Sequence, residues 1–202
     1  MKKVIIIGAS GSLARFVIDA IKALDGIELT LFARNRQRLH KGAEQGTTVI
    51  EGDATDYHSI RQAISGQDIV YVNLAGDLEV MAGNIVKAMK ETSVQRIIAI
   101  SSIGIYQTPL RPVLAPYRKL ADIVENSGLT YTILRPDWFT NDNKIDYTLT
   151  TKGKPETGTA IPGKALLHLS QKSWETRIYI KTKTWASVNL NSVFRLPRTP
   201  TT

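Results

Sequence analysis

The sequence predicts an α/β fold, a doubly wound parallel sheet with the strand order 3-2-1-4-5-6. Apolar runs alternate with helical patterns at regular intervals along the first 136 residues, which is typical of parallel strands joined by helices. The strands are near-continuous runs of Val, Ile and Leu, as expected for a sheet that is covered on both faces. The first strand also ends in a glycine-containing turn that leads directly into a helix.

The periodicity of the apolar residues gives approximate bounds for each element. Strands are expected at 3–8, 27–33, 47–51, 68–74, 96–101 and 130–135. Helices are expected at 12–24, 36–42, 56–65, 78–92 and 113–127, and Pro116 suits the first turn of the last one. Ligands of such sheets bind at the carboxyl ends of the strands, so a site is predicted at the ends of the first and fourth strands.

The turn after the first strand, Gly8-Ala9-Ser10-Gly11-Ser12-Leu13-Ala14, is predicted to bind the pyrophosphate of a nucleotide. Gly8 and Gly11 have no Cβ, so backbone N–H groups can approach a phosphate closely. The following helix directs its positive dipole end at the same place. The alternative is an ordinary glycine-rich turn, because the spacing Gly-x-x-Gly-x-x-Ala departs from G-x-G-x-x-G. The predicted contacts are Gly8, Ser10, Gly11, Ser12 and Leu13.

Arginine follows the second strand, where an acidic residue would bind the ribose hydroxyls of NAD(H). Arg34 is therefore predicted to bind the 2′-phosphate of NADP(H), because a guanidinium contacts phosphate oxygens through two parallel N–H groups. Arg36 and Arg38 are candidate second contacts. The alternative is that these arginines only solvate a short helix.

The other strand ends carry small or polar residues that suit the rest of a dinucleotide. After the third strand, Asp53 is expected to accept a hydrogen bond from the adenine amine beside Ala54, and Asp56 is expected to cap the next helix. After the fifth strand, a serine hydroxyl would either orient a carbonyl substrate or satisfy the loop. The further predicted residues are Leu74, Ala75, Gly76 and Ser101 at the cofactor and Ser102 as a catalytic candidate.

Composition excludes several classes of protein. The 202 residues with 43% hydrophobic content suit one globular domain, and the absence of cysteine excludes disulfides and thiol nucleophiles. The three histidines are scattered and show no metal-ligand spacing. No segment has the length of a signal peptide or a membrane span, so a soluble cytoplasmic protein is expected.

The net charge of +8 does not indicate a nucleic-acid partner, because it is unevenly distributed. Residues 162–202 hold seven of the 26 Lys and Arg but one of the 18 Asp and Glu. The basic excess therefore belongs to the last fifth of the chain, which has no recognisable nucleic-acid-binding motif. The expected partner is a small-molecule substrate.

With these residues placed, the chain resembles the atypical short-chain dehydrogenase/reductases, particularly the small NmrA-like, NAD(P)H-binding group that includes a biliverdin reductase. The resemblance covers about residues 1–161 and rests on the opening turn, Arg34, 52–56 and Ser101-Ser102. Its most specific part is 127–136, which begins Ser-Gly-Leu and ends Leu-Arg-Pro. It implies a Rossmann-type domain that binds NADPH, with Pro136 and Trp138 near the nicotinamide.

Tyr117 is the candidate proton donor, and its surroundings depart from the family pattern. Typical short-chain dehydrogenases activate this tyrosine with a lysine four residues later on the same helical face. Here that position is Ala121, and Lys119 lies on another face. Members of the atypical group often lack this pair. Some of them reduce flavins, quinones or similar conjugated acceptors, where bound NADPH needs little side-chain help, and others bind the nucleotide without turning it over.

Two functions therefore stay open. One is an NADPH-dependent oxidoreductase of the atypical short-chain type, acting on a small conjugated acceptor such as a quinone, a flavin or a ketone-like compound. The other is a non-catalytic NADP(H)-binding redox sensor that signals through a protein partner. An epimerase or dehydratase of nucleotide sugars is less favoured, because little chain remains for a substrate domain after residue 136.

Residues 162–202 are expected to form an atypical basic tail outside the NAD(P)-binding domain of residues 1–161. The family usually continues with Ser-Arg-x-x-Val-Ala and a helix that packs on the sheet. Permissive codons for this chain, read from the third base of the Ile161 codon, encode a segment that begins in this way. We therefore hypothesise that a reading-frame shift produced the tail, which resequencing of the source DNA would test.

Overall fold

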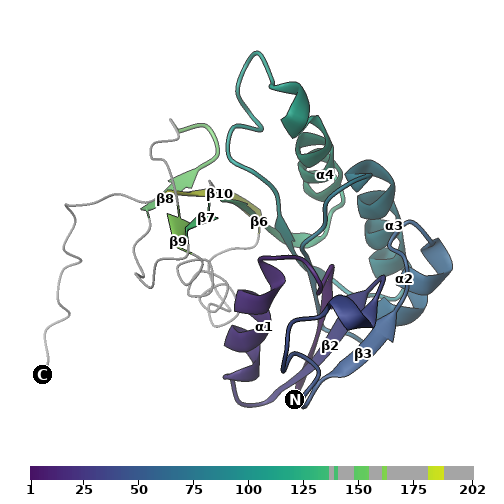
Figure 1. The fold of residues 1–202 in the computed structure, drawn as a ribbon. Helices are drawn as coiled ribbons and strands as arrows, with labels where there is room; N and C mark the ends of the chain where they lie inside the picture. Colours follow the sequence, from purple (N-terminus) through teal and green to yellow (C-terminus); the bar gives the residue numbers. More distant parts are fainter. Residues whose placement is uncertain (137–138, 141–147, 155–160, 163–181, 189–202) are drawn as a thin grey trace, which may run out of the picture.

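The computed structural model describes residues 1–136, 139–140, 148–154, 161–162 and 182–188, and its centre is a twisted sheet with helices on both faces (Figure 1). Six parallel strands run in the order 3-2-1-4-5-6, as predicted. Each of the six begins and ends within two residues of its predicted bounds. They are β1 (Lys2–Ile7), β2 (Ile27–Ala33), β3 (Thr48–Glu51), β4 (Ile69–Val72), β5 (Arg96–Ile100) and β6 (Thr130–Pro136).

Two further strands extend the sheet beyond β6. β10 (Thr182–Val188) pairs in parallel with β6, and β8 (Thr148–Thr151) pairs antiparallel with β10. β7 (Phe139–Thr140) and β9 (Ile161–Pro162) form a separate small parallel pair. The tail therefore contributes a strand to the main sheet, which the sequence did not predict, while its origin in a frame shift stays a prediction.

The four predicted longer helices are present, and they divide between the two faces of the sheet. α1 (Ala14–Lys22) lies on one face, and α2 (Tyr57–Ile64), α3 (Leu78–Glu91) and α4 (Ala115–Glu125) lie on the other (Figure 1). The short helix predicted over 36–42 is only a 3-10 turn, η1 (Arg36–Arg38). A second 3-10 turn, η2 (Pro112–Leu114), leads directly into α4. No helix in the described residues has the length and apolarity needed to cross a membrane.

The alternation of side chains along β1 explains why its apolar run is continuous. Ile5 and Ile7 are fully buried in the cluster beneath α2, α3 and α4, whereas Val4 and Ile6 are fully buried in the cluster beneath α1. Successive residues of a strand point to opposite faces, so a sheet covered on both sides needs an apolar residue at every position.

Side-chain caps fix two of the helices that follow the strand ends. Asp56 accepts hydrogen bonds from the N–H groups of His58 (3.1 Å) and Ser59 (3.2 Å), so its predicted capping role is confirmed. Asp77 caps α3 in the same way through the N–H of Val80 (3.3 Å). These caps hold the loops that leave the carboxyl ends of β3 and β4.

Candidate nucleotide-binding site

An open cavity of about 700 Å³ runs across the carboxyl ends of the parallel strands, where the sequence predicted a site. It is lined from the turn after β1 to the start of α4. The predicted residues Gly8, Ser10, Gly11, Ser12, Leu13, Arg34, Asp53, Ala54, Leu74, Ala75, Ser101, Ser102, Tyr117 and Pro136 all line it. Gly76 instead lines a smaller depression beside Asp77 and Lys119, and Trp138 lies outside the described residues.

The two glycines of the opening turn lie close to Asn73, the residue that follows β4. Gly8 has a φ of +87°, and a Cβ built on it would lie 2.1 Å from the carbonyl oxygen of Asn73. A Cβ on Gly11 would lie 2.9 Å from the side-chain nitrogen of Asn73. A side chain at position 8 would therefore collide with the backbone of Asn73, whereas one at position 11 would require the Asn73 side chain to shift. Asn73, which also lines the cavity, was not predicted as a site residue.

The opening turn leaves several backbone donors without a partner. The N–H groups of Gly8 and Ala9 donate to the carbonyl of Phe32 at 3.0 and 3.1 Å, and the N–H of Gly11 donates to Gly8 at 3.0 Å. The remaining N–H groups, those of Ser10, Ser12 and Leu13, donate no hydrogen bond within the described chain. These donors stand at the start of α1, which no side chain caps, so they suit an anion.

The three arginines after β2 have different surroundings. Arg34 and Arg38 are exposed and line the cavity. Arg36 does not line it, because its guanidinium binds Glu44 at 2.5 and 2.9 Å and its N–H donates to Glu51 at 2.8 Å. The hydrogen bond from Arg36 lowers the pKa of Glu44. Arg36 is therefore an ion-paired surface residue rather than a candidate phosphate ligand.

Asp53 is held as an ionised acceptor at the same end of the cavity. One carboxylate oxygen accepts hydrogen bonds from both the N–H and the hydroxyl of Thr55, each at 2.8 Å. These two bonds, with a smaller contribution from the charge of Arg34, lower the pKa of Asp53 below its ordinary value of 3.8. The second oxygen makes no hydrogen bond in the described chain, so it can accept one from a ligand.

The two serines after β5 have separate roles. The hydroxyl of Ser101 donates a 3.0 Å hydrogen bond to the backbone carbonyl of Tyr117, and Ser101 is buried. Ser102 is half-buried, lines the cavity and makes no side-chain hydrogen bond in the described chain. Ser101 therefore satisfies the backbone of a neighbouring element, whereas the hydroxyl of Ser102 is available to bind a ligand.

Tyr117 lines the cavity, and no lysine in the described part of the chain lines it as well. Lys119 forms an ion pair with Glu79 at the start of α3. Ala121, at the position where typical short-chain dehydrogenases have lysine, is fully buried against the core. The structure therefore agrees with the sequence that Tyr117 lacks the usual lysine.

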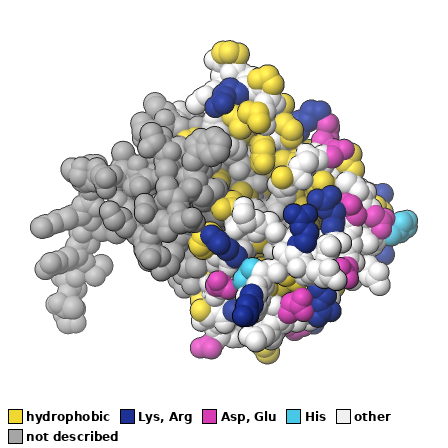
Figure 2. Space-filling view, in the orientation of Figure 1, with side chains coloured by type: hydrophobic (Ala, Val, Ile, Leu, Met, Phe, Trp, Pro, Cys, Tyr) yellow, Lys and Arg dark blue, Asp and Glu magenta, His cyan; other side chains and the backbone are white. Residues whose placement is uncertain are grey.

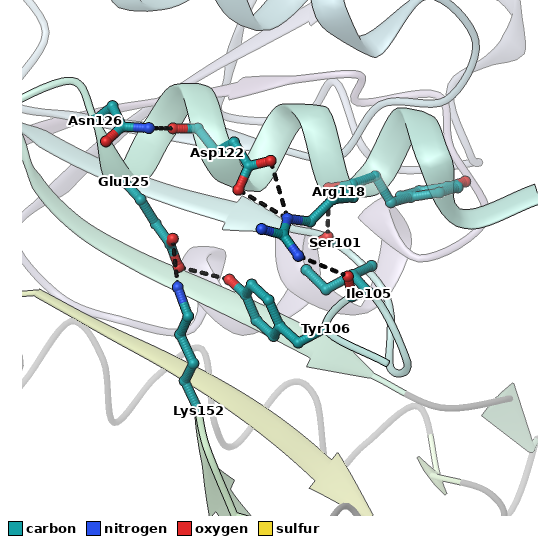
Figure 3. Close-up of polar contacts among 9 residues, drawn as sticks. Ser101, Ile105, Tyr106, Arg118, Asp122, Glu125, Asn126 and Lys152 are labelled. Carbon is teal, nitrogen blue, oxygen red and sulfur yellow. Dashed lines mark hydrogen bonds and ion pairs between the residues drawn. The ribbon is translucent and has the colours of Figure 1, made fainter. Parts of the chain in front are cut away.

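Polar contacts attach the loop after Ser102 to the helix α4 (Figure 3). The Nε of Arg118 binds both carboxylate oxygens of Asp122 at 2.8 and 2.9 Å, and its Nη1 donates to the carbonyl of Ile105 at 3.3 Å. Farther along the loop, the hydroxyl of Tyr106 donates to Glu125 at 2.5 Å. The loop is thus attached at two points to the helix that carries Tyr117.

Several lining residues were missed because no local sequence signal marks them. Arg111, Val113 and Leu114 lie between β5 and α4 and reach the cavity only through the path of the intervening loop. Met81 enters it from α3. Among the described residues, no group of His, Cys, Asp and Glu is arranged to hold a metal ion.

A doubly wound sheet, with a glycine-containing turn after its first strand and a cavity along its carboxyl edge, is the architecture of a Rossmann-type domain. The chain belongs to the NAD(P)H-binding family, whose sequence profile matches residues 8–167. This match confirms the predicted NAD(P)H-binding family, and the relatives of the chain are consistent with the NmrA-like atypical short-chain group.

Solved structures share this architecture over nearly the whole chain. A Rossmann-fold NAD(P)-binding family protein from Shigella flexneri is 36% identical, with a TM-score of 0.84 over 97% of this chain and 100% of that one. A wide-type short-chain dehydrogenase/reductase from Veillonella parvula, in complex with NADP, also has a TM-score of 0.84. It is 22% identical over 93% of this chain and 94% of that one, a likeness that shows the fold alone.

Two characterised relatives are reductases. Quinone oxidoreductase 2 of Escherichia coli is 25% identical over 68% of this chain and 49% of its own length. Phenylcoumaran benzylic ether reductase IRL1 of Ginkgo biloba is 26% identical over 76% of this chain and 53% of its own length. The chain spans about half the length of these relatives.

Proposed function

We propose that the chain is an NADPH-dependent oxidoreductase that reduces a small conjugated acceptor, such as a quinone, a flavin or a ketone-like compound. The observation that carries this proposal is that one continuous cavity is lined by Arg34 and Arg38, after β2, and by Ser102 and Tyr117, after β5 and on α4. The turn with its free N–H groups lies along the same cavity, so one extended dinucleotide could meet all three features.

The residues fit each part of NADPH. The free N–H groups of the turn and the dipole of α1 suit the pyrophosphate. Arg34 and Arg38 suit the 2′-phosphate, since guanidinium groups bind phosphate oxygens strongly. The free oxygen of Asp53 suits the adenine amine, and Pro136 borders the nicotinamide end.

At the nicotinamide end, the cofactor supplies a hydride when bound, and the chain orients the acceptor. The hydroxyl of Ser102 can donate a hydrogen bond to an acceptor oxygen, and the hydroxyl of Tyr117 can transfer a proton to it. Without a neighbouring lysine, this acid suits acceptors whose reduced form spreads its negative charge over a conjugated system. The quinone named for the Escherichia coli relative belongs to the same class of acceptor.

A second candidate function is an NADP(H)-binding redox sensor that acts through a protein partner. Two observations favour it. Lys119 is ion-paired with Glu79, and the position that holds lysine in typical short-chain dehydrogenases is the buried Ala121. Both leave the site with few groups for acid–base work. The cavity end at Ser102 and Tyr117 favours the enzyme.

Two measurements test the proposal. Titration of the purified full chain should show tighter binding of NADPH than of NADH, and steady-state oxidation of NADPH should follow on addition of quinones or flavins. Binding without turnover across quinones, flavins and ketones would support the sensor instead. Absence of binding to either nucleotide at low salt would contradict both functions.

A further inference from the structure

The far end of the cavity is built by the loop after β5, by η2 and by the first turn of α4. The hydroxyl of Ser101 holds the backbone of Tyr117, and a Cβ on Gly104 would lie 3.1 Å from the Leu114 side chain. These contacts place η2 over the end of β5. The cavity residues of this segment therefore lie toward β5 and β6, away from the arginines after β2.

Arg111 gives this end of the cavity a positive charge that the dinucleotide does not use. Arg34 and Arg38 follow β2, at the end proposed for the 2′-phosphate, whereas the nicotinamide end of NADPH has no phosphate. Arg111 is exposed, lines the cavity and forms no ion pair with any described residue. Arg36 and Arg118, by contrast, are paired with Glu44 and Asp122. The guanidinium of Arg111 is thus available to an anion from outside the chain.

Apolar side chains line the same cavity as this cation. Val113 is 65% exposed, and it lines the cavity together with the half-buried Leu114. Figure 2 shows hydrophobic side chains gathered over the region of η2 and the start of α4, with a basic side chain among them. An apolar wall with a cation at its edge fits a flat ring system that carries a negative group.

We propose that Arg111, Val113 and Leu114 form an acceptor subsite that selects conjugated acceptors bearing a carboxylate or a phosphate. This inference rests on the proposed reductase function. Val113 and Leu114 contact the ring system, and Arg111 binds its anionic substituent. In the reduction, the acceptor gains a hydride from NADPH and a proton from Tyr117 or solvent, and the dinucleotide leaves as NADP⁺.

The test compares acceptors that differ only in the anionic group. Flavin fluorescence is titrated with the full chain in the presence of saturating NADP⁺, which occupies the pyrophosphate site, using flavin mononucleotide and riboflavin. A second pair, a naphthoquinone with and without a carboxylate, competes against the bound flavin. The chain should bind the charged member of at least one pair about tenfold more tightly, the scale of a hydrogen bond to a charged group.

Arg111→Gln should remove this preference while leaving binding of the neutral member and of NADPH within about twofold, since no hydrogen bond to a charged group is lost there. Arg61→Gln is the matched control, because Arg61 is an exposed arginine of α2 outside the cavity and is paired with Glu91. It should retain the preference.

Equal affinity within both pairs, or no binding of any of the four compounds, would overturn the inference. A loss of NADPH affinity in Arg111→Gln, with the acceptor preference retained, would assign Arg111 to the dinucleotide instead. A different result would contradict the proposed function itself: the unmodified chain would neither bind NADPH nor oxidise it.

Discussion

The hydroxyl of Ser101 donates a hydrogen bond to the backbone carbonyl of Tyr117 at 3.0 Å, and this bond joins the end of β5 to the first turns of α4. Both residues line the cavity, and the bond engages only the backbone of Tyr117. The position of the candidate proton donor is thus set through its backbone by a residue of another element. Ser102, one position later, has no such structural task in the described chain.

Ser101→Ala should lower the free energy of unfolding by about 1 kcal/mol, the usual net contribution of one hydrogen bond. Ser102→Ala should change stability less, because no hydrogen bond in the described chain is lost, and should instead lower the rate of acceptor reduction. Urea denaturation and steady-state kinetics on both variants check this division. A larger loss of stability in Ser102→Ala would contradict it.

Arg34→Ala should weaken NADPH binding by about 1.5–3 kcal/mol, the range for a hydrogen bond to a charged group, and should leave NADH binding nearly unchanged. Arg36→Ala is the matched control, because Arg36 is two residues away but is bound to Glu44 outside the cavity. It should retain the affinity for both nucleotides in calorimetric titrations. Equal losses of NADPH and NADH affinity in Arg34→Ala would show that Arg34 is structural.

Gly8→Ala should be far more damaging than Gly26→Ala, although both glycines have positive φ values, +87° and +76°. An alanine at position 26 meets nothing within 4 Å, so it should cost about 1–2 kcal/mol of backbone strain. An alanine at position 8 would add a collision with the carbonyl of Asn73, so we expect a further loss of stability and no NADPH binding. Thermal unfolding curves for the pair separate the two contributions, and similar melting temperatures would contradict the prediction.

Tyr117→Phe should lower kcat for acceptor reduction by about 10²-fold, the lower range for loss of a general acid, without changing NADPH affinity. Lys119→Gln should leave kcat unchanged, because Lys119 is bound to Glu79 and does not line the cavity. Stopped-flow measurement of NADPH oxidation distinguishes the two variants. A matching fall in Lys119→Gln would restore the role of lysine seen in typical short-chain dehydrogenases.

Asp53→Asn should reduce stability at neutral pH and not at low pH. The folded state lowers the pKa of Asp53 below 3.8, so the ionised carboxylate stabilises the fold above that value, and this contribution is lost as the pH falls through the folded pKa. The difference between the unmodified chain and Asp53→Asn should therefore be present at pH 7 and vanish in strong acid. Denaturation curves over this pH range measure it, and a constant difference would contradict the assignment.

Local patterns were sufficient to predict the six-stranded sheet and the glycine-containing turn after its first strand. The order of the strands follows from the handedness of their crossovers, and the fully buried run in β1 follows from cover on both faces. The turn could be predicted from Gly8 and Gly11, and the positive φ of Gly8 is a conformation that favours glycine. Such features depend on residues near one another in the chain, which is why periodicity and spacing reveal them.

Choices between neighbouring residues depended on partners brought from elsewhere by the fold. Arg36 is excluded from the cavity by Glu44, which the next loop carries, and Ser101 rather than Ser102 is committed to Tyr117 on another element. Arg111 reaches the cavity only because η2 folds over the end of β5. An exposed charge or hydroxyl carries no periodic signal, so its role follows from long-range contacts that a one-dimensional pattern does not contain.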